Sequence, residues 1–380
     1  MRVLITGARA PVALEWARIA MQSGHEAWLT DSMRRPLTRY AAGIAGYHEL
    51  PSPRADVRAY ARALDTLVNT CEIDLIIPTC EEILYLAIAR DHMQSTVRWL
   101  MAERDILFQL HDKFAAQQLL AGLGAIAIPA TQLRESPESI TTDPETILKP
   151  VYSRFGRQVI RGVQAGVLTA AQIHSGRPWV QQQMLRGQAV CTYALLDHGR
   201  VIAHQAYLPR YCLNQSASTY FEPHSDARLD TFILQFGERT AFHGQVAFDF
   251  IEDSGTLYVI ECNPRATSGL HLIHSGLSLD ADGSIGYAPA TLAPHRAGIA
   301  LPLFFGLGAM RRGEWSELMR DHRLARDVFA DARYPLPFRA PLMGLAEIIG
   351  RSLRTGRWLT DASTRDIEWD GPADSQEDGP

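Results

Sequence analysis

The pattern of apolar and polar positions in the first 105 residues alternates between short buried strands and amphipathic helices. Strands are predicted at residues 3–6, 25–30 and 74–78, where short apolar runs are bounded by turn residues. Helices are predicted at residues 11–23 and 56–70. Because strands that alternate with helices favour an open parallel sheet, we expect residues 1–105 to form an N-terminal Rossmann-like α/β domain.

Beyond residue 105 the apolar pattern changes. A helical stretch at 107–123 is followed by segments with a period of two, which is typical of antiparallel strands. Strands are expected at 146–150, 158–161, 179–184, 189–196 and 201–207, a helix at 228–242, and a hairpin at 245–251 and 256–263. The chain is therefore predicted to be α/β and α+β, with a connector and lid subdomain at 106–187 and an antiparallel-sheet subdomain at 188–279. Residues 280–380 predict a helical extension that ends in a polar, disordered tail at 373–380.

The expected hairpin carries candidate chemistry. Residues alternate faces along a strand, so Glu261 and Asn263 project from the same side. A three-residue loop at 253–255 would pair Asp249 with Val259 and place Asp249 and Glu261 on one face. A change of one residue in the loop would move Asp249 to the other face, so the prediction depends on that turn.

Two ionised carboxylates close together favour a cation. At about 4 Å they would repel by about 4 kcal/mol at an effective dielectric constant near 20. Asp249, Glu261 and Asn263 offer the hard oxygen atoms that Mg²⁺ prefers, and Mg²⁺ usually shares its coordination shell with nucleotide phosphates. The alternative is that both acids are strand-end residues paired with nearby arginines such as Arg265.

The stretch at 258–265, with the sequence YVIECNPR, resembles the E-x-N-P-R signature of ATP-grasp enzymes, in particular the branch of carbamoyl phosphate synthetase. The resemblance implies an ATP-grasp fold and a carboxylate-amine ligase that forms an acyl phosphate and releases ADP and phosphate. It implies ATP as cosubstrate, with Mg²⁺, or Mn²⁺ as a second option, on Asp249, Glu261 and Asn263. It also implies that Arg265 faces the transferred phosphoryl group, where positive charge assists a loose transition state.

The same resemblance suggests further contacts to the nucleotide phosphates. Lys149 ends an apolar strand and resembles the family's lid lysine, with a catalytic role. Lys113 resembles the family's earlier nucleotide-contacting lysine, although a solvated surface charge is the alternative. The segment 153–158 takes the place of the glycine-rich loop, with Gly156 as its one glycine, so Arg154 and Arg157 are expected to add charge to the phosphate contacts. A surface hairpin is the alternative for this segment.

A segment rich in glutamine resembles the hinge that binds the adenine edge in ATP-grasp enzymes. The candidate nucleotide contacts are Gln182, Gln183, Met184 and Leu185. In many relatives an acid that binds the ribose hydroxyls follows shortly after, whereas Gln188 and Ala189 stand at that place here. This departure keeps a catalytically silent ATP-binding or regulatory module as an alternative.

The family architecture implies that a carboxylate substrate lies between the first domain and the hairpin. Arg210 is a candidate catalytic contact, although it lies in a polar, loop-like run at 210–219. Ser268, Gly269 and His271 are further candidates, and a packed core histidine is the alternative for His271. Glu82 follows a buried strand, where it could meet an amine, but capping of the next helix is the expected role.

Composition narrows the class of partner. A net charge of −5 provides no basic field for nucleic acid, and no apolar run reaches the roughly 20 residues that span a bilayer. The five cysteines are scattered and lack the spacing of a zinc site, which suits a reduced cytoplasm. We therefore expect small-molecule carboxylate and amine substrates, no nucleic-acid or membrane partner, and a homodimer as a possibility raised by the resemblance alone.

The opening strand-turn-helix also imitates a dinucleotide-binding unit. Gly7 follows the first strand and Asp31 ends the second, as in an NAD-dependent oxidoreductase or epimerase. The second and third glycines of that fingerprint are missing, so this alternative is the weaker one.

Overall fold

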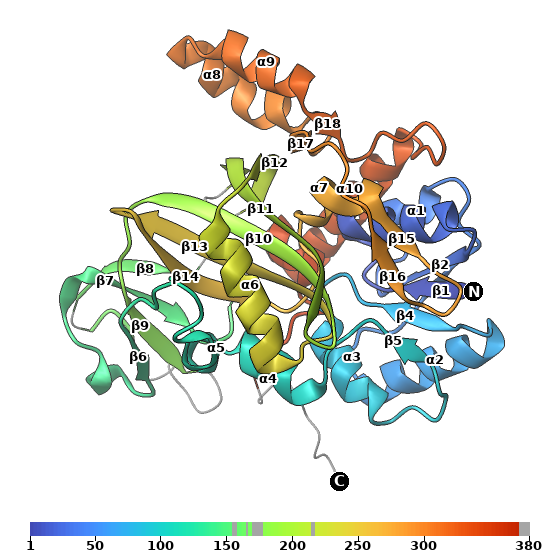
Figure 1. Ribbon diagram of the computed structural model, residues 1–380, viewed down its shortest axis with the longest axis horizontal. Helices are drawn as coiled ribbons and strands as arrows, with labels where there is room; N and C mark the ends of the chain where they lie inside the picture. The colour runs from blue at the N-terminus through green and yellow to red at the C-terminus, as the bar shows by residue number, and fades with distance from the viewer. Residues whose placement is uncertain (154–157, 165, 169–177, 214–216, 372–380) are drawn as a thin grey trace.

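The computed structural model describes residues 1–153, 158–164, 166–168, 178–213 and 217–371 (Figure 1). It combines one parallel sheet with antiparallel sheets, which confirms the predicted fold class. None of the helices in the described part of the chain combines the length and the apolar composition that a bilayer crossing requires.

The N-terminal part is an open parallel sheet. Five strands have the order β3-β2-β1-β4-β5, and every pairing is parallel. The strands are β1 (Arg2–Ile5), β2 (Glu26–Asp31), β3 (Gly46–Glu49), β4 (Leu75–Ile77) and β5 (Arg98–Trp99). The helices are α1 (Pro11–Gln22), α2 (Val57–Thr70) and α3 (Ile83–Arg90), and a 3-10 turn η1 covers Leu37–Tyr40. Helices cover the sheet because its strands are apolar on both faces.

The predicted connector helix at 107–123 is wrong in one respect, because it is two helices. They are α4 (Arg104–His111) and α5 (Lys113–Leu120). Asp112 separates them, and its side chain accepts hydrogen bonds from the backbone N–H groups of Phe114 and Ala115 at 2.8 and 2.9 Å. An N-cap aspartate satisfies amides that a continuous helix would pair internally, so it starts a new helix with Lys113 in the first position.

The next part is a four-stranded antiparallel sheet of order β6-β9-β7-β8. Its strands are β6 (Thr131–Arg134), β7 (Asp143–Pro150), β8 (Ile160–Val163) and β9 (Trp179–Gln183), with a 3-10 turn η2 at Pro137–Ser139. In Figure 1 it lies beside the edge of the larger sheet formed by β14 and β13.

The larger sheet has seven strands in the order β14-β13-β10-β11-β12-β17-β18. Its long strands are β10 (Gln188–Asp197), β11 (Arg200–Leu213), β12 (Ala217–His224), β13 (Gly244–Asp253) and β14 (Thr256–Asn263). Helix α6 (Ala227–Thr240) crosses one face (Figure 1), where Phe232 packs edge-on against Phe248 with 5.0 Å between ring centroids. One face of β13 is thereby fixed against α6, and the alternate residues of the strand face the opposite side.

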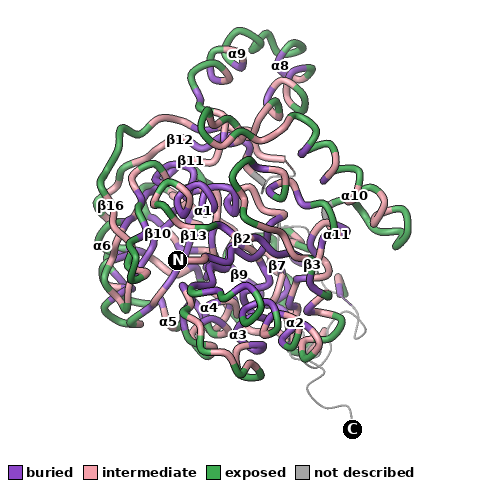
Figure 2. Tube along the Cα trace, turned by 90° about the vertical axis from the view of Figure 1, so that its right-hand side faces the viewer, coloured by how far each residue is buried: buried purple, intermediate pink, exposed green. Residues whose placement is uncertain are grey.

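Between the hairpin and the predicted extension lie α7 (Leu270–Ile273), η3 (His274–Gly276) and β15 (Leu277–Leu279). The extension beyond residue 280 contains the helices α8 (Gly306–Arg312), α9 (Trp315–Leu324), α10 (Arg339–Thr355) and α11 (Leu359–Thr364), with a π-helical turn η4 (Leu301–Phe305). It is less helical than predicted, because it also contains β16 (Ile285–Tyr287), β17 (His295–Arg296) and β18 (Arg326–Asp327). Strands β17 and β18 extend the large sheet beyond β12, and these two-residue strands are too short for a periodicity to reveal. Figure 2 shows α8, α9 and α10 as largely exposed segments that project from the buried body. The predicted disordered tail lies outside the described residues.

A buried ionic cluster ties α1 to α7. The Glu15 carboxylate lies 2.8 Å from Nδ1 of His271 and 3.2 Å from Nη1 of Arg18, and its side chain is 1% exposed. Burial alone would raise the pKa of Glu15, but His274, His271 and Arg18 outweigh burial and lower this pKa to about 2.

We expect Glu15→Gln to lower the free energy of unfolding by about 3 kcal/mol at neutral pH, because it removes one partner of a buried ionic network. A carboxylate whose pKa is lowered on folding stabilises the fold above its unfolded pKa. The difference between wild type and variant should therefore shrink as the pH falls from about 4.5 to about 2. Urea unfolding at a series of pH values measures this, with Glu49→Gln at an exposed position as control. A difference that does not change with pH would contradict the assignment.

Candidate functional site

A β-bulge places the two acids of the hairpin side by side. The expected three-residue loop is wrong, because Asp253 pairs with Thr256 and the turn is the two residues Ser254 and Gly255, with φ of 51° and 80°. This register alone would place Asp249 opposite Ile260 and turn Glu261 to the other face.

The register shifts between Asp249 and Phe250, so Asp249 lies directly opposite Glu261. Bulges commonly redirect side chains beside functional sites, and this one gives the expected proximity by a different route from the predicted turn.

The bulge makes a half-buried, oxygen-rich centre. The Asn263 amide nitrogen donates to Oδ2 of Asp249 at 3.3 Å. Burial, followed by the charge of Glu261, raises the pKa of Asp249 to about 6. These three side chains fit a hard divalent cation. Its positive charge would offset both the repulsion between the two carboxylates and the cost of burying the charge of Asp249, which are the two causes of the raised pKa.

Both lysines of the chain meet at this centre. Lys113 Nζ lies 3.2 Å from Oε1 of Glu261, and Lys149 Nζ donates to the Ile260 carbonyl oxygen at 3.2 Å. Burial lowers the pKa of Lys149 to about 8, although the charge of Glu261 opposes this effect. Burial raises and Lys113 lowers the pKa of Glu261, and the net result is a pKa below its usual value.

The scarcity of lysine in the sequence was a signal for this centre, and it was not used in the sequence-based predictions. The chain has 37 lysines and arginines together, and only Lys113 and Lys149 are lysines. A chain that uses arginine almost everywhere has lysines only where two ammonium groups converge on one glutamate. An ammonium is a compact point charge with rotatable donors, whereas guanidinium is a larger planar fork, so the two groups are not interchangeable at a crowded site.

Arg265 contacts both this centre and the N-terminal domain. Its Nη2 atom lies 2.5 Å from Oε1 of Glu81, and it donates to Oδ1 of Asn263 at 3.2 Å. Glu81 was not predicted, and its neighbour Glu82 was expected to cap α3. Glu82 instead accepts from the Thr6 hydroxyl at 2.6 Å and makes no capping hydrogen bond.

These groups line a cleft of about 920 Å³ between the small sheet, the large sheet and the N-terminal sheet. Known pockets for small ligands have volumes of about 300–1,000 Å³. The lining residues include Ile147, Lys149, Gln182, Met184, Leu185, Asp249 and Glu261, and also Pro11, Cys80, Tyr207, Phe221, Ser268 and His271. The cleft therefore has the size of a small-ligand pocket.

No family model and no curated protein matches the chain. Solved structures do match. N5-carboxyaminoimidazole synthetase from Staphylococcus aureus complexed with ADP has a TM-score of 0.60 and 14% identity, over 82% of this chain and 86% of that chain. L-amino acid ligase from Bacillus licheniformis has a TM-score of 0.54 and 14% identity, over 73% and 70%. The biotin carboxylase domain dimer of 2-oxoglutarate carboxylase from Hydrogenobacter thermophilus, with MgADP, ADP and bicarbonate, has a TM-score of 0.56 and 14% identity, over 74% and 68%.

These proteins share one architecture, and this decides the fold. The chain has the ATP-grasp fold. The cleft just described, here called the ATP-grasp cleft, is lined by residues of both antiparallel sheets, and the bulged hairpin contributes Asp249, Glu261 and Asn263 to this lining.

The residues predicted to form the hinge line the ATP-grasp cleft, but several of their polar groups already form hydrogen bonds with neighbouring segments. Gln182 is buried and donates through its amide to the Thr131 hydroxyl at 2.9 Å. The backbone N–H groups of Gln183 and Met184 donate to the backbone carbonyl oxygens of residues 130 and 145, each at 2.8 Å. An adenine edge could not bind those two amides without breaking these bonds. Just beyond them, a Cβ on Gly187 would lie 1.9 Å from the carbonyl oxygen of Glu252, so the chain needs glycine for this close approach.

Two expectations concern the phosphate loop and the ribose. The candidates Arg154, Gly156 and Arg157 lie outside the described residues. Among the described residues that line the ATP-grasp cleft, the carboxylates are Asp249 and Glu261, so no acid of that set takes the place of the family's ribose acid.

The structure places Arg210 away from the centre. The run at 210–219, expected as a loop, belongs to β11 and β12 where it is described. Nη2 of Arg210 lies 2.8 Å from Oδ2 of Asp321 on α9, and Nη1 lies 3.0 Å from Glu222. The Tyr211 hydroxyl also donates to Asp321 at 2.8 Å. Arg210 thus holds the C-terminal helices to the large sheet.

We expect Arg210→Ala to lower the free energy of unfolding by about 1–2 kcal/mol and to leave ATP turnover near that of wild type, since this arginine is a third exposed and does not line the cleft. Chemical unfolding and a steady-state assay measure the two effects, with Arg323→Ala at an exposed position on α9 as control. A loss of turnover without a loss of stability would restore Arg210 as a substrate contact.

The other substrate-side candidates lie on or beside the cleft. Ser268 and His271 line it, and His271 is fixed by Glu15 and stacks on Phe221 with 5.8 Å between ring centroids. A Cβ on Gly269 would lie 2.3 Å from Cβ of Tyr193, which makes this glycine a packing requirement for α7. This part of the cleft wall is therefore preformed.

Proposed function

We propose that this chain is an ATP-dependent ligase that activates a carboxylate as an acyl phosphate and transfers the acyl group to an amine. The observation that supports this most is the convergence of the chain's two lysines on a half-buried pair of acids that line an ATP-grasp cleft. Phosphoryl transfer needs little from a protein beyond position and positive charge around the phosphate oxygens, and this centre offers both.

In the proposed site, Asp249, Glu261 and Asn263 would hold Mg²⁺, which would supply positive charge to offset that of the phosphates. Lys149 and Lys113 donate to phosphate oxygens, and the desolvated surroundings of Lys149 strengthen its interaction with an anion. Arg265 adds positive charge on the substrate side, and Glu81 fixes its orientation.

The proposed reaction has two steps. A carboxylate oxygen of the substrate attacks the γ-phosphorus, the bond to the bridging oxygen breaks, and ADP leaves. The amine nitrogen then attacks the acyl carbon, the bond to the phosphate oxygen breaks, and phosphate leaves while the amine gives up a proton.

We infer that the carboxylate belongs to an amino acid or a peptide-like acid. The match to an L-amino acid ligase supports this class, and so does a preformed part of the cleft wall with mixed polar and aromatic residues. The second candidate function is a silent nucleotide-binding module. This candidate is favoured by Gln188, which stands where an acid that binds the ribose was expected.

A turnover screen tests the proposal. Purified protein is incubated with Mg-ATP, hydroxylamine and single members of an amino-acid panel, and ADP, phosphate and hydroxamate are measured. The proposed ligase releases ADP and phosphate only when an acid is present, and it yields the matching hydroxamate. Release of AMP and pyrophosphate would exclude the acyl-phosphate route.

Lysine labelling distinguishes the silent nucleotide-binding module from the ligase. Because the chain has two lysines, an amine-reactive reagent can modify only Lys113, Lys149 and the Met1 amino group. Mg-ATP should slow modification of both lysines and leave Met1 unchanged as the internal reference, whether or not turnover follows. Protection without turnover on the whole panel would favour the silent module, and absence of protection would exclude both.

A further inference from the structure

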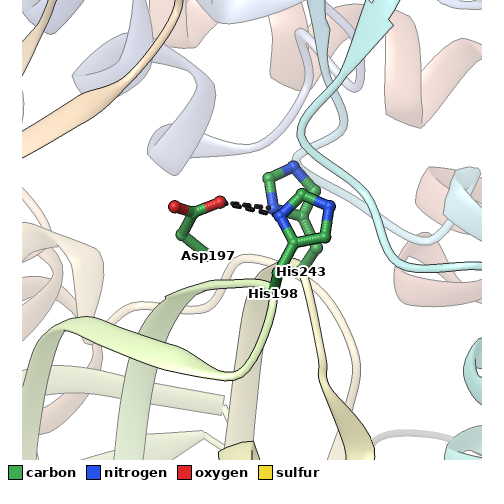
Figure 3. A group of neighbouring side chains, drawn as sticks. All are labelled: Asp197, His198 and His243. Carbon is green, nitrogen blue, oxygen red and sulfur yellow. Dashed lines mark hydrogen bonds and ion pairs between the residues drawn. The ribbon is translucent and has the colours of Figure 1, made fainter.

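A second cluster of metal-binding side chains lies far from the nucleotide cleft. Asp197 is the last residue of β10, His198 follows it in the tight turn to β11, and His243 lies in the connection from α6 to β13 (Figure 3). Nδ1 of His198 lies 2.9 Å from Oδ1 of Asp197, and Nδ1 of His243 lies 3.3 Å from the same oxygen. The donor atoms of all three residues lie within 4.8 Å of one another.

His243 presents a lone pair to a carboxylate. Its Nε2 atom lies 3.1 Å from the Trp99 carbonyl oxygen, which can only accept, so Nε2 carries the hydrogen. In the neutral ring Nδ1 then bears the lone pair. This buried nitrogen has no hydrogen-bond partner in the part of the chain that the structure describes, although it faces Asp197. Two lone pairs that face each other repel, and a cation between them would turn this repulsion into two bonds.

The distances suit a transition-metal ion. Zinc binds imidazole nitrogen at about 2.0–2.1 Å and carboxylate oxygen at about 2.0–2.2 Å, so neighbouring ligands lie about 3 Å apart. The two donor separations to Asp197 are already of this size. The His198 side chain is 77% exposed and can turn to complete the set. Its ring stacks on that of His243 at a centroid distance of 4.3 Å, so only a small rotation is needed.

Outer contacts hold the two less exposed ligands as they do in known metal sites. Ligating histidines usually give their second N–H to a carbonyl or a carboxylate, and ligating carboxylates are hydrogen-bonded in turn. His243 meets the first condition through Trp99, and Asp197 meets the second through Nη2 of Arg200 at 3.3 Å.

We propose that Asp197, His198 and His243 form a binding site for one divalent ion of the zinc class. Imidazole and carboxylate ligands suit zinc and its neighbours better than magnesium. On binding, His198 moves its ring hydrogen from Nδ1 to Nε2, so no proton needs to leave the site. The fourth ligand is water from the adjoining cavity of about 440 Å³.

The site is separate from the proposed magnesium centre. Cys191 lines the nucleotide cleft, and Asp197 follows six residues later on the same strand, about 20 Å away in an extended chain. An ion here would join the β10–β11 turn to the connection before β13, and through Trp99 to the parallel sheet. We therefore assign it the role of a clasp between the sheets.

Zn²⁺ titration of the full-length, tag-free and chelator-treated protein tests the site. The titration is done in a Glu261→Gln background, so that zinc bound at the nucleotide centre is weakened, and a chromophoric chelator reports the free ion. One Zn²⁺ per chain should bind and raise the melting temperature. His198→Asn keeps a residue that tolerates the left-handed turn, where φ is 47°, and should weaken binding by about 100-fold or more, because even outer-shell changes cost about 10- to 100-fold.

His243→Gln should weaken binding to a similar extent, and His92→Ala, at an exposed histidine outside the cluster, should leave it unchanged. Folding of each variant is checked by its melting temperature without metal. Binding of Zn²⁺ that both cluster variants retain, or absence of stoichiometric binding in the Glu261→Gln parent, would overturn the proposal. Neither result would touch the proposed ligase activity.

Discussion

Glu261→Gln should reduce ATP-dependent turnover by at least about 10²- to 10³-fold, the loss typical of removing one preorganised electrostatic group from a reaction centre. The amide keeps the shape of the side chain but removes the charge that balances Lys113 at 3.2 Å and that would hold the metal ion. ADP release under saturating Mg-ATP measures the effect.

The matched control for this variant is Glu238→Gln on the exposed face of α6, which should retain full turnover. The far-ultraviolet spectrum of Glu261→Gln should remain that of wild type, because the β13–β14 pairing does not depend on this charge. Turnover near the wild-type level in Glu261→Gln would sink the assignment of the centre.

Lys149→Met should weaken Mg-ATP binding by about 10- to 150-fold, since a hydrogen bond to a charged group is worth about 1.5–3 kcal/mol. Methionine fills a similar volume without the charge. Calorimetric titration measures the affinity, and Leu148→Met, on the same strand but packed in the core away from the cleft, is the control for packing. Unchanged affinity in Lys149→Met would remove this lysine from the phosphate site.

The same variant should be no less stable than wild type. Burial lowers the pKa of Lys149 to about 8 from 10.5, so the folded state binds this proton less tightly than the unfolded state. The wild-type free energy of unfolding should therefore rise between about pH 8 and pH 10.5 relative to the variant. Unfolding midpoints across this range would show the opposite trend if the lysine stabilised the fold by its charge.

The sequence was sufficient for the fold and for most of the centre, because both rest on local patterns. Alternating strands and helices predicted the parallel sheet, and the ECNPR stretch pointed to the hairpin. The expected turn was wrong, and the bulge between Asp249 and Phe250 gave the same proximity. A bulge adds one residue to one strand without a composition of its own, so periodicity could not reveal it.

Other features depend on contacts between distant segments. Arg210 lies in a polar stretch that looked like a loop, but Asp321, more than a hundred residues later, pairs with it and draws it to the C-terminal helices. Glu81 meets Arg265 from another sheet. The cluster with His243 unites two turns that no spacing connects. Such pairings are set by tertiary packing, whereas the two lysines could have been noted from composition alone.

Positional isotope exchange tests the central claim most directly. ATP labelled with heavy oxygen at the β–γ bridge is incubated with the protein, Mg²⁺ and the acid found in the screen, without the amine. Reversible transfer of the γ-phosphoryl group to the acid frees the β-phosphate to rotate, so the label should move to non-bridging β positions, and Glu261→Gln should prevent this. Retention of the label in the β–γ bridge in wild type, or identical scrambling in Glu261→Gln, would contradict acyl phosphate formation at this centre.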